Sequence, residues 1–413
     1  MSNWQKVKIG DFLFERKGRY KPNDEQIVNL PRIEKIDFSG NFHIGNKDSK
    51  TDMILIKDGD LVISGINVAK GAMGIYSGED VTATIHYSSY TFDSNKINVE
   101  YFKRFLKSSE FIELLNEQVK GGIKTEIKPK HILPLEIQLP DINTQAQIVQ
   151  HFENVEDDIA DVTKEVLKQE SLLKKLKQTI LQEAIEGKLT AKWRAKNPDI
   201  GTAKKLLEQI KTEKEQLVKD KKIKASKLLA PINEDEIPFD IPQNWEWCRT
   251  DDICFSISSG STPSKDAFIG DDGISYLKVY NIQNQKIDFH FKPQFIKQKI
   301  NNTKLKRSIL YPQDVVMNIV GPPLGKIAII PNIYPQWNCN QAIVHFKLIE
   351  PLMHKYLYYF LRELSFLKYI HFKGVAGQDN ISITQSRNIL FPLPPLEEQK
   401  EIVATIEKLF TLC

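Results

Sequence analysis

The feature that most constrains the fold is a long helical stretch in the middle of the chain, residues 143–187. Its apolar residues alternate at spacings of four and three, and the alternation is interrupted only at Gln169. A spacing that averages 3.5 residues is typical of a coiled-coil seam, which is a narrow apolar stripe facing a partner helix. The seam residues are Ile148, Phe152, Val155, Ile159, Val162, Val166, Leu173, Leu176 and Ile180.

Both ends of this stretch carry helix boundary signals. Asn143 or Thr144 is expected to accept the free amide hydrogens of the first turn, and Gly187 is expected to end the helix in a left-handed conformation. No proline lies between them. At about 1.5 Å per residue the helix would be roughly 65 Å long, so we predict a rigid spacer.

The start of this helix recurs at the end of the chain, where residues 140–159 match residues 394–413 at a constant offset of 254. The matched pairs are Pro140 with Pro394, Gln145 with Gln399, Ile148 with Ile402, Val149 with Val403, Phe152 with Ile406, and Val155 with Leu409. The second copy therefore has its own seam residues, Ile402, Ile406 and Leu409, over only about five helical turns.

The rest of the chain repeats as well. The further pairs are Trp4 with Trp245, Phe12 with Ile253, Gly18 with Gly260, Asp60 with Asp314, Gly71 with Gly325, and Ile75 with Ile329. Collinear matches over this length indicate a duplicated domain. We predict an α+β fold of two duplicated, β-rich mixed α/β units, separated by long α-helices that form a coiled-coil spacer, with a pseudo-two-fold arrangement. The predicted domains are residues 1–140, the helical spacer and linker 141–240, residues 241–393, and a short second helical region 394–413.

Length and composition limit the classes of function. A chain of 413 residues with 41% hydrophobic residues is expected to form two or three soluble domains. A net charge of only +4 means that any nucleic-acid surface must be a local patch. Four cysteines without a C-x-x-C pair argue against a disulfide framework and a zinc cluster, and no apolar stretch is long enough to span a bilayer. We expect a cytoplasmic location.

The linker after the long helix contains a lysine-rich stretch, residues 202–227, followed by an acidic, proline-bearing segment. Glutamates interleave with these lysines, so we interpret the stretch as a solvated helix face, with phosphate contact as the alternative.

Motifs for catalysis are missing from the sequence. Residues 321–327, GPPLGKI, are too short for a phosphate loop and lack the serine or threonine that would hold magnesium. Asn197-Pro198-Asp199 lacks the second proline and the aromatic ring with which amino-methyltransferases hold a flipped base. The eight histidines show no metal-ligand spacing. We therefore predict a chain that is not an enzyme and has no metal site.

Several stretches carry a resemblance to a known family: NWxxxxIGD near the start, LPDINTQAQIV and LPPLEEQKEIV at the two helix starts, LKQTILQEAIEGKLTAKWRAKNPD, and EDEIPFDIPQNWEWCR. In their order, and over essentially the whole chain, these stretches resemble the specificity subunit of type I restriction-modification systems, which act in host defence.

The resemblance implies two target recognition domains, each reading one half of a bipartite DNA site, and helices that pack as an antiparallel coiled coil and dock the methylase. It implies double-stranded DNA, two methylase subunits and motor/restriction subunits as partners. S-adenosylmethionine, ATP and magnesium would be bound by those partners and not by this chain.

The short second helical region leaves the seam from Val162 to Ile180 without an intrachain partner. We hypothesise that it is covered by another copy of the chain through self-association, by a methylase helix, or by the returning linker.

Reading of base edges needs donors and acceptors on loops, with lysine and arginine nearby to hold phosphates. The candidate DNA-binding residues are Arg16, Lys17, Arg19, Tyr20, Lys21, Lys120 and Lys124 in the first unit, and Ser261, Thr262, Ser264, Lys265, Asn340, Gln341, Lys373, Gln378 and Asn380 in the second. For each of them, an ordinary exposed position in a loop is the alternative.

Other classes of function stay open at this point. One is a non-enzymatic coiled-coil interaction scaffold, and another is the specificity subunit of a related methylation system that is not type I. An autonomous methyltransferase or nuclease is disfavoured by the missing motifs.

Overall fold

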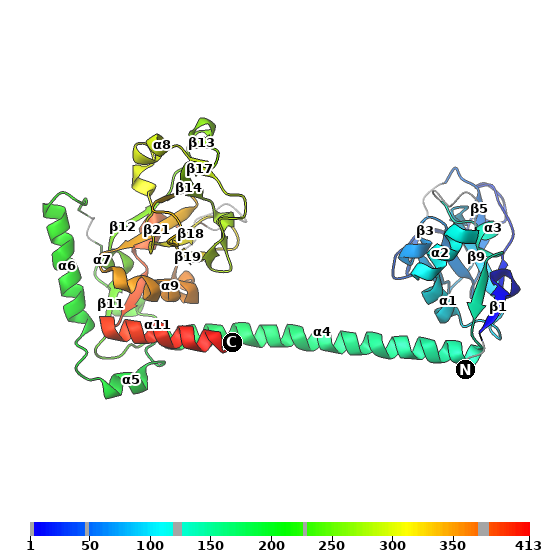
Figure 1. Ribbon diagram of the computed structural model, residues 1–413, viewed down its shortest axis with the longest axis horizontal. Coiled ribbons are helices and arrows are strands. Elements are labelled where there is room, and N and C mark those ends of the chain that lie inside the picture. The colour runs from blue at the N-terminus through cyan, green and yellow to red at the C-terminus, as the bar shows by residue number, and fades with distance from the viewer. Residues whose placement is uncertain (1–3, 46–48, 119–125, 226–228, 371–379) are drawn as a thin grey trace. The chain divides into compact units, whose positions relative to one another are not determined.

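The computed structural model describes residues 4–45, 49–118, 126–225, 229–370 and 380–413 (Figure 1). It contains two compact units, Met1–Val166 and Leu167–Cys413, and the boundary between them falls inside the long helix. None of the described helices is both long enough and apolar enough to cross a membrane. The finer division into four domains stays a prediction.

Unit 1 contains two four-stranded sheets, ordered β2-β9-β6-β7 and β4-β3-β8-β5, and the antiparallel pair β1-β10. Its strands are β1 (Gln5–Lys8), β2 (Leu13–Glu15), β3 (Arg32–Ile36), β4 (Phe42–Gly45), β5 (Met53–Ile56), β6 (Leu61–Ser64), β7 (Met73–Ile75), β8 (Val81–Thr84), β9 (Tyr87–Phe92) and β10 (Glu136–Leu139). Its short helices are α1 (Val99–Leu106), α2 (Ser109–Gln118) and α3 (Pro129–Ile132).

Unit 2 has sheets ordered β12-β21-β18-β19 and β13-β17-β14-β20, with the pairs β11-β22 and β15-β16. Its strands are β11 (Glu246–Arg249), β12 (Cys254–Ser259), β13 (Phe268–Ile269), β14 (Ile274–Leu277), β15 (Ile282–Gln283), β16 (Lys286–Ile287), β17 (Phe295–Ile296), β18 (Val315–Asn318), β19 (Ile327–Ile329), β20 (Trp337–Cys339), β21 (Ile343–Leu348) and β22 (Leu390–Leu393). Its helices, besides the end of α4, are α5 (Ala191–Lys196), α6 (Ala203–Lys219), α7 (Thr250–Ile253), α8 (Gln298–Asn302), α9 (His354–Glu363), α10 (Ile383–Arg387) and α11 (Leu396–Thr411).

The first sheets of the two units have the same topology. Strands β2, β9, β6 and β7 of unit 1 correspond in order and direction to β12, β21, β18 and β19 of unit 2. The second sheets share an antiparallel and a parallel pairing, β4-β3-β8 in unit 1 and β17-β14-β20 in unit 2. The predicted fold class, two β-rich units of mixed α/β structure joined by a long helix, is therefore confirmed.

The long helix, α4, runs from Ile142 to Ile185. The prediction that Asn143 or Thr144 caps it is wrong. The carboxylate of Asp141 accepts from the backbone amides of both residues, at 3.1 and 3.0 Å, because it lies one residue before the first turn. At the other end Gly187 is left-handed, with φ 71°, as predicted.

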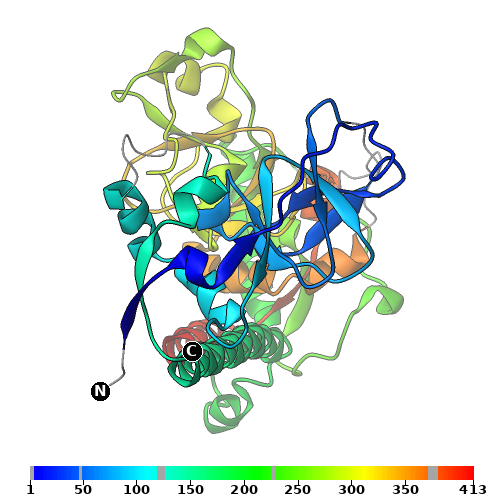
Figure 2. The same ribbon diagram turned by 90° about the vertical axis from the view of Figure 1, so that its right-hand side faces the viewer.

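Helix α11 packs antiparallel to the last turns of α4 within unit 2 (Figure 1, Figure 2). Glu398 near the start of α11 is bonded to Thr190, while Phe410 near its end lies 5.8 Å from the amine of Lys177. The seam residues Ile180, Ile402 and Ile406 are buried in one core. The expectation that the seam as far as Ile180 has no intrachain partner is therefore wrong at Ile180, which packs against α11. From Phe152 to Val166 the seam is exposed, and Ile159 and Val162 are 61% and 64% accessible.

The lysine-rich stretch is more than a solvated face. It forms α6, which buries Ala203, Leu207 and Ile210 in the core of unit 2. Its lysines are exposed except Lys214, which is partly buried and pairs with Asp251. The apolar residues on one face of α6 therefore pack into the core, although glutamates and lysines surround them in the sequence.

Candidate nucleic-acid interface

In unit 1 the predicted basic loop follows β2. Its first residue, Arg16, forms a bidentate ion pair with Asp60, with Nε to Oδ2 and Nη2 to Oδ1 both at 2.6 Å. Asp60 is 1% exposed and also accepts from Ser89 Oγ at 2.7 Å and from the amide of Lys57 at 3.0 Å. Burial alone would raise the pKa of Asp60, but the hydrogen bonds from Arg16 and Ser89 lower it below its ordinary value. The ion pair therefore joins the residue that follows β2 to the residue that precedes β6 in the same sheet.

The other residues of this loop differ in how far their side chains are engaged. Lys17 and Arg19 are exposed. Lys21 is exposed too, and its amine lies 2.8 Å from Asp52. Tyr20 exchanges backbone hydrogen bonds with Met53 on β5, which fixes the path of the loop. The structure thus leaves Lys17, Arg19 and Lys21 at the surface. Lys120 and Lys124 lie outside the described residues.

In unit 2 two of the predicted loops come together where β12 and β20 end. The amide of Gly260 donates to Ile343 O and the amide of Ser261 to Cys339 O, both at 3.1 Å. A side chain on Gly260 would collide with the carbonyl oxygen of Cys339, so only glycine permits this approach.

We call the group formed there, Ser261, Thr262, Asn340 and Gln341, the reading junction. The hydroxyl of Thr262 donates to the side-chain oxygen of Gln341, and both side chains are exposed. Asn340 Oδ1 is buried without a hydrogen-bond partner among the described residues. The junction therefore presents hydroxyl and amide groups, which are the groups that recognise base edges.

The remaining candidates of unit 2 are not part of the reading junction. Ser264 and Lys265 are exposed beside Asp266, and the hydroxyl of Ser264 lowers the pKa of that carboxyl. Asn380 forms a β-bridge with Val320. Lys373 and Gln378 lie outside the described residues.

One basic segment next to the reading junction is absent from the predicted set. It runs from Lys297 to Arg307, and Arg307 Nη2 donates to Ser261 Oγ at 3.0 Å. The signal was present in the sequence, because five of these eleven residues are lysine or arginine and none is acidic.

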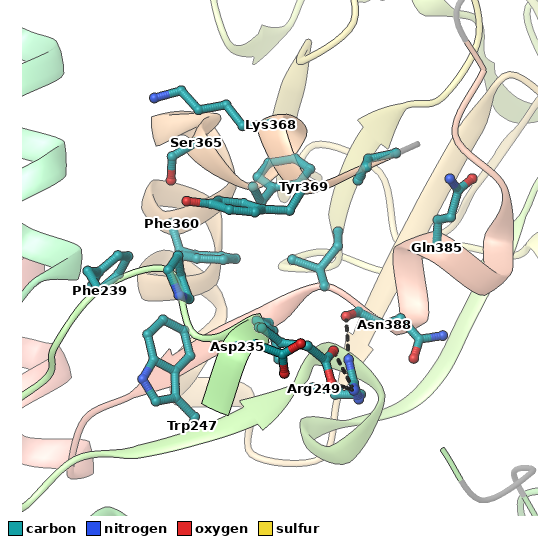
Figure 3. Close-up of a pocket in the computed structure, with 16 residues that line it drawn as sticks. Asp235, Phe239, Trp247, Arg249, Phe360, Ser365, Lys368, Tyr369, Gln385 and Asn388 are labelled. Atoms are coloured by element: carbon teal, nitrogen blue, oxygen red, sulfur yellow. Dashed lines mark hydrogen bonds and ion pairs between the residues drawn. The ribbon is translucent and has the colours of Figure 1, made fainter. Parts of the chain in front are cut away.

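A separate cavity of about 480 Å³ lies elsewhere in unit 2, between the linker and α9 (Figure 3). Aromatic side chains, among them Phe239, Trp247 and Tyr369, line it together with Arg249. The guanidinium of Arg249 donates to Glu236 at 3.0 Å, to Asn388 O at 3.2 Å and to Ala230 O at 3.3 Å. Since its charge is satisfied by these groups, Arg249 anchors the acidic linker to the sheet.

Groups suited to metal binding do not gather in the part of the chain that the structure describes, where no three His, Cys, Asp or Glu side chains lie close enough to share an ion. The four cysteines are free thiols, and three of them are buried. Burial raises the pKa of Cys339 to about 12, so this thiol is a packing residue rather than a nucleophile.

Comparison with known proteins points to one family. A family model described as "Type I restriction modification DNA specificity domain" matches residues 242–413. The EcoEI specificity subunit of Escherichia coli is 32% identical over 254 residues, which cover 59% of this chain and 41% of that protein. The EcoAI specificity subunit of Escherichia coli is 27% identical over 95% of this chain and 74% of its own length. The chain thus spans less than half of the first relative and about three quarters of the second.

Solved structures agree at the level of the fold. A chain from a study of the assembly and conformational transition of the type I R-M system aligns with a TM-score of 0.63 and 15% identity, over 99% of this chain and 90% of the other. The HsdS subunit from Thermoanaerobacter tengcongensis aligns with a TM-score of 0.57 and 15% identity, over 99% and 89% of the two chains.

Proposed function

We propose that the chain is a specificity subunit of the type I restriction-modification family and that it reads a bipartite site on double-stranded DNA, with one half-site for each unit. The observation that carries this proposal is the shared topology of the two units. Two similar sheets with different loop residues are suited to reading two different sequences on the same kind of ligand. Unit 1 would use Lys17, Arg19, Tyr20 and Lys21, and unit 2 would use the reading junction.

Helix α4 would set the spacing of the two half-sites. It has 44 residues, which corresponds to about 66 Å at 1.5 Å per residue. A stiff connection fixes both the distance and the helical phase between two contacts on a duplex. We propose that a pseudo-two-fold axis relates the two repeats, with α11 as the start of the antiparallel partner of α4.

Catalysis would be carried out by other subunits. We propose that two methylase subunits holding S-adenosylmethionine dock on the helical region, and that motor/restriction subunits using ATP and magnesium join them in the cytoplasm. The exposed seam from Phe152 to Leu176 offers them apolar surface. A second copy of the chain is the other occupant, and it would favour the alternative function of an interaction scaffold.

The proposal is tested by co-expressing the chain with its methylase in a host without other methylation and sequencing the methylome. We expect one bipartite motif that disappears when either the chain or the methylase is omitted. Co-purification with the methylase and no change in any methylated motif would support the scaffold instead. Methylation by the purified chain alone would overturn the non-catalytic assignment.

The spacer role has its own test, the insertion of one heptad into α4 after Val162. Seven residues add about 10 Å, or about three base pairs of duplex, while the seam stays in register. We expect loss of methylation at the original site, because about three base pairs turn the second half-site by roughly a third of a turn while one heptad turns the helix by only about 20°. Any bipartite motif that remains should have a longer gap. An unchanged gap would show that α4 does not set the spacing of the half-sites.

A further inference from the structure

We propose that Lys297–Arg307 is the phosphate-binding segment of unit 2, and that unit 2 therefore contributes more of the electrostatic binding of DNA than unit 1. This inference rests on the proposed function and assigns a role to residues that the predicted interface did not include.

The first argument is charge. Lys297, Lys299, Lys304, Lys306 and Arg307 are all exposed, and no acidic residue lies among them in the sequence. The lysine-rich α6 differs, because glutamates alternate with its lysines. With a net charge of only +4 on the whole chain, a run of five cations is the kind of local patch that neutralises phosphates.

The second argument is that the segment is held rigidly on its inner side. Asn301 and Asn338 are both fully buried, and the side-chain amide of Asn338 donates to Asn301 Oδ1 at 2.8 Å and to Leu305 O at 3.1 Å. Ser308 is buried as well. Buried hydrogen bonds thus hold the backbone of the segment in place while its cations are exposed. The segment therefore needs little ordering when a ligand binds.

The third argument is position. Arg307 donates to Ser261 of the reading junction, and the hydroxyl of Tyr276 donates to Ser261 O at 2.8 Å. Phosphate contacts set the register in which neighbouring groups meet the base edges. Contacts between this segment and the DNA phosphates, directly beside the reading junction, would place Thr262 and Gln341 in the adjoining groove of the duplex.

The fourth argument is the contrast with unit 1. The segment follows β17 and precedes Leu310, which pairs with β20. The corresponding connection in unit 1 follows β4 and precedes β5, which pairs with β8. That connection, residues 46–52, has two lysines and two aspartates in its sequence and therefore no net charge. The phosphate-binding segment is thus a property of one repeat.

The test is a salt series of DNA binding. Lys297, Lys299, Lys304 and Lys306 are replaced together by glutamine in the full chain, and Arg307 is left in place to keep its bond to Ser261. Affinity for a fluorescein-labelled duplex of mixed sequence is measured by anisotropy from about 50 to 200 mM KCl. Each lost phosphate contact should reduce the slope of log K against log salt by about 0.9, so we expect a reduction of about 2 to 4 and a loss of affinity of at least about tenfold.

A matched variant controls for net charge. In it glutamine replaces four lysines of α6 and of the turn after it, Lys204, Lys205, Lys219 and Lys221. We expect its slope to stay close to that of the wild type. An equal drop in both variants, or no drop in the first, would overturn the inference. Wild-type chain that binds no duplex at low salt would instead refute the proposed DNA recognition, so the two failures are distinguishable. Circular dichroism checks that both variants are folded.

Discussion

Arg16 and Asp60 are 44 residues apart and form a bidentate ion pair in which the carboxylate is almost completely buried. This pair joins the loop after β2 to the start of β6. It removes Arg16 from the set of cations that are available to a ligand, although the sequence placed it among the best candidates.

Replacing Arg16 by alanine should therefore affect stability before DNA binding. The change leaves Asp60 charged and buried without its partner, and we expect a loss of about 3 kcal/mol in the free energy of unfolding of unit 1. Urea denaturation followed by circular dichroism measures it. Arg19→Ala is the control, since this exposed side chain should change stability by less than about 0.5 kcal/mol. Equal effects of the two variants would contradict the structural role of the ion pair.

Replacing Arg19 and Lys21 together by alanine should weaken binding of the first half-site without unfolding the unit. The ion pair of Lys21 with Asp52 is exposed, so its loss should cost little stability. We expect lower affinity on every sequence and a flatter salt dependence, because phosphate contacts are not specific. Anisotropy over a salt series checks this. Unchanged affinity at all salt concentrations would exclude the two residues from the interface.

Gln341→Ala should relax recognition at one position of the second half-site. A bidentate amide contact to a base discriminates by about 1 to 3 kcal/mol, and alanine cannot replace it. Methylome sequencing of the variant should show a degenerate base in that half-site and an unchanged first half-site. An identical motif would mean that Gln341 contacts no base. Loss of the whole motif would point to misfolding, which thermal unfolding detects.

His345 should make the fold sensitive to acid. It is fully buried in β21, and burial, with a smaller effect of Lys347, lowers its pKa to about 3. The unfolded chain takes up this proton near pH 6.5, so between those values the unfolded state binds more protons than the folded state. Stability should therefore fall as pH falls, by about 1.4 kcal/mol per pH unit.

Comparison with His345→Leu isolates this contribution, because other titrating groups, such as the partly buried Asp314, are present in both proteins. We expect the variant to lose less stability between pH 6.5 and pH 4. His290→Leu, at an exposed position, should keep the wild-type pH dependence. Parallel curves for all three proteins would exclude His345 as the sensitive group.

Glu398 should be essential for joining the end of α4 to unit 2. Its buried carboxylate accepts from Thr190 Oγ1 at 2.8 Å and from Trp245 Nε1 at 2.9 Å, and it pairs with Arg194. Glu398→Ala leaves these donors unsatisfied, and we expect a loss of about 3 kcal/mol. The exposed neighbour Glu397 is the control, and its replacement by alanine should cost less than about 0.5 kcal/mol. Tryptophan fluorescence during denaturation distinguishes the two.

The duplication and the rod could be predicted because their signals are local or collinear. The heptad spacing from Ile148 to Ile180 is enough to specify a helix with one apolar stripe. The paired residues of the two repeats also take equivalent positions: Gln145 and Gln399 donate to the carbonyl oxygens of Pro140 and Pro394, at 2.8 and 2.9 Å. Gly71 and Gly325 are both left-handed. Such matches could be predicted because equivalent residues occur in the same order in both repeats.

The sequence by itself determined the repeat, the long helix with its seam and the resemblance to one family, since each depends on spacings within a short stretch or on an alignment. The tertiary structure alone decided which charges remain free. Arg16 is taken up by an aspartate that sheet pairing brings to it, while Lys297–Arg307 is turned outward beside Ser261 by a buried amide pair. The physical reason is that a side chain's availability depends on partners distant in the sequence, and only strand register and packing bring those partners together.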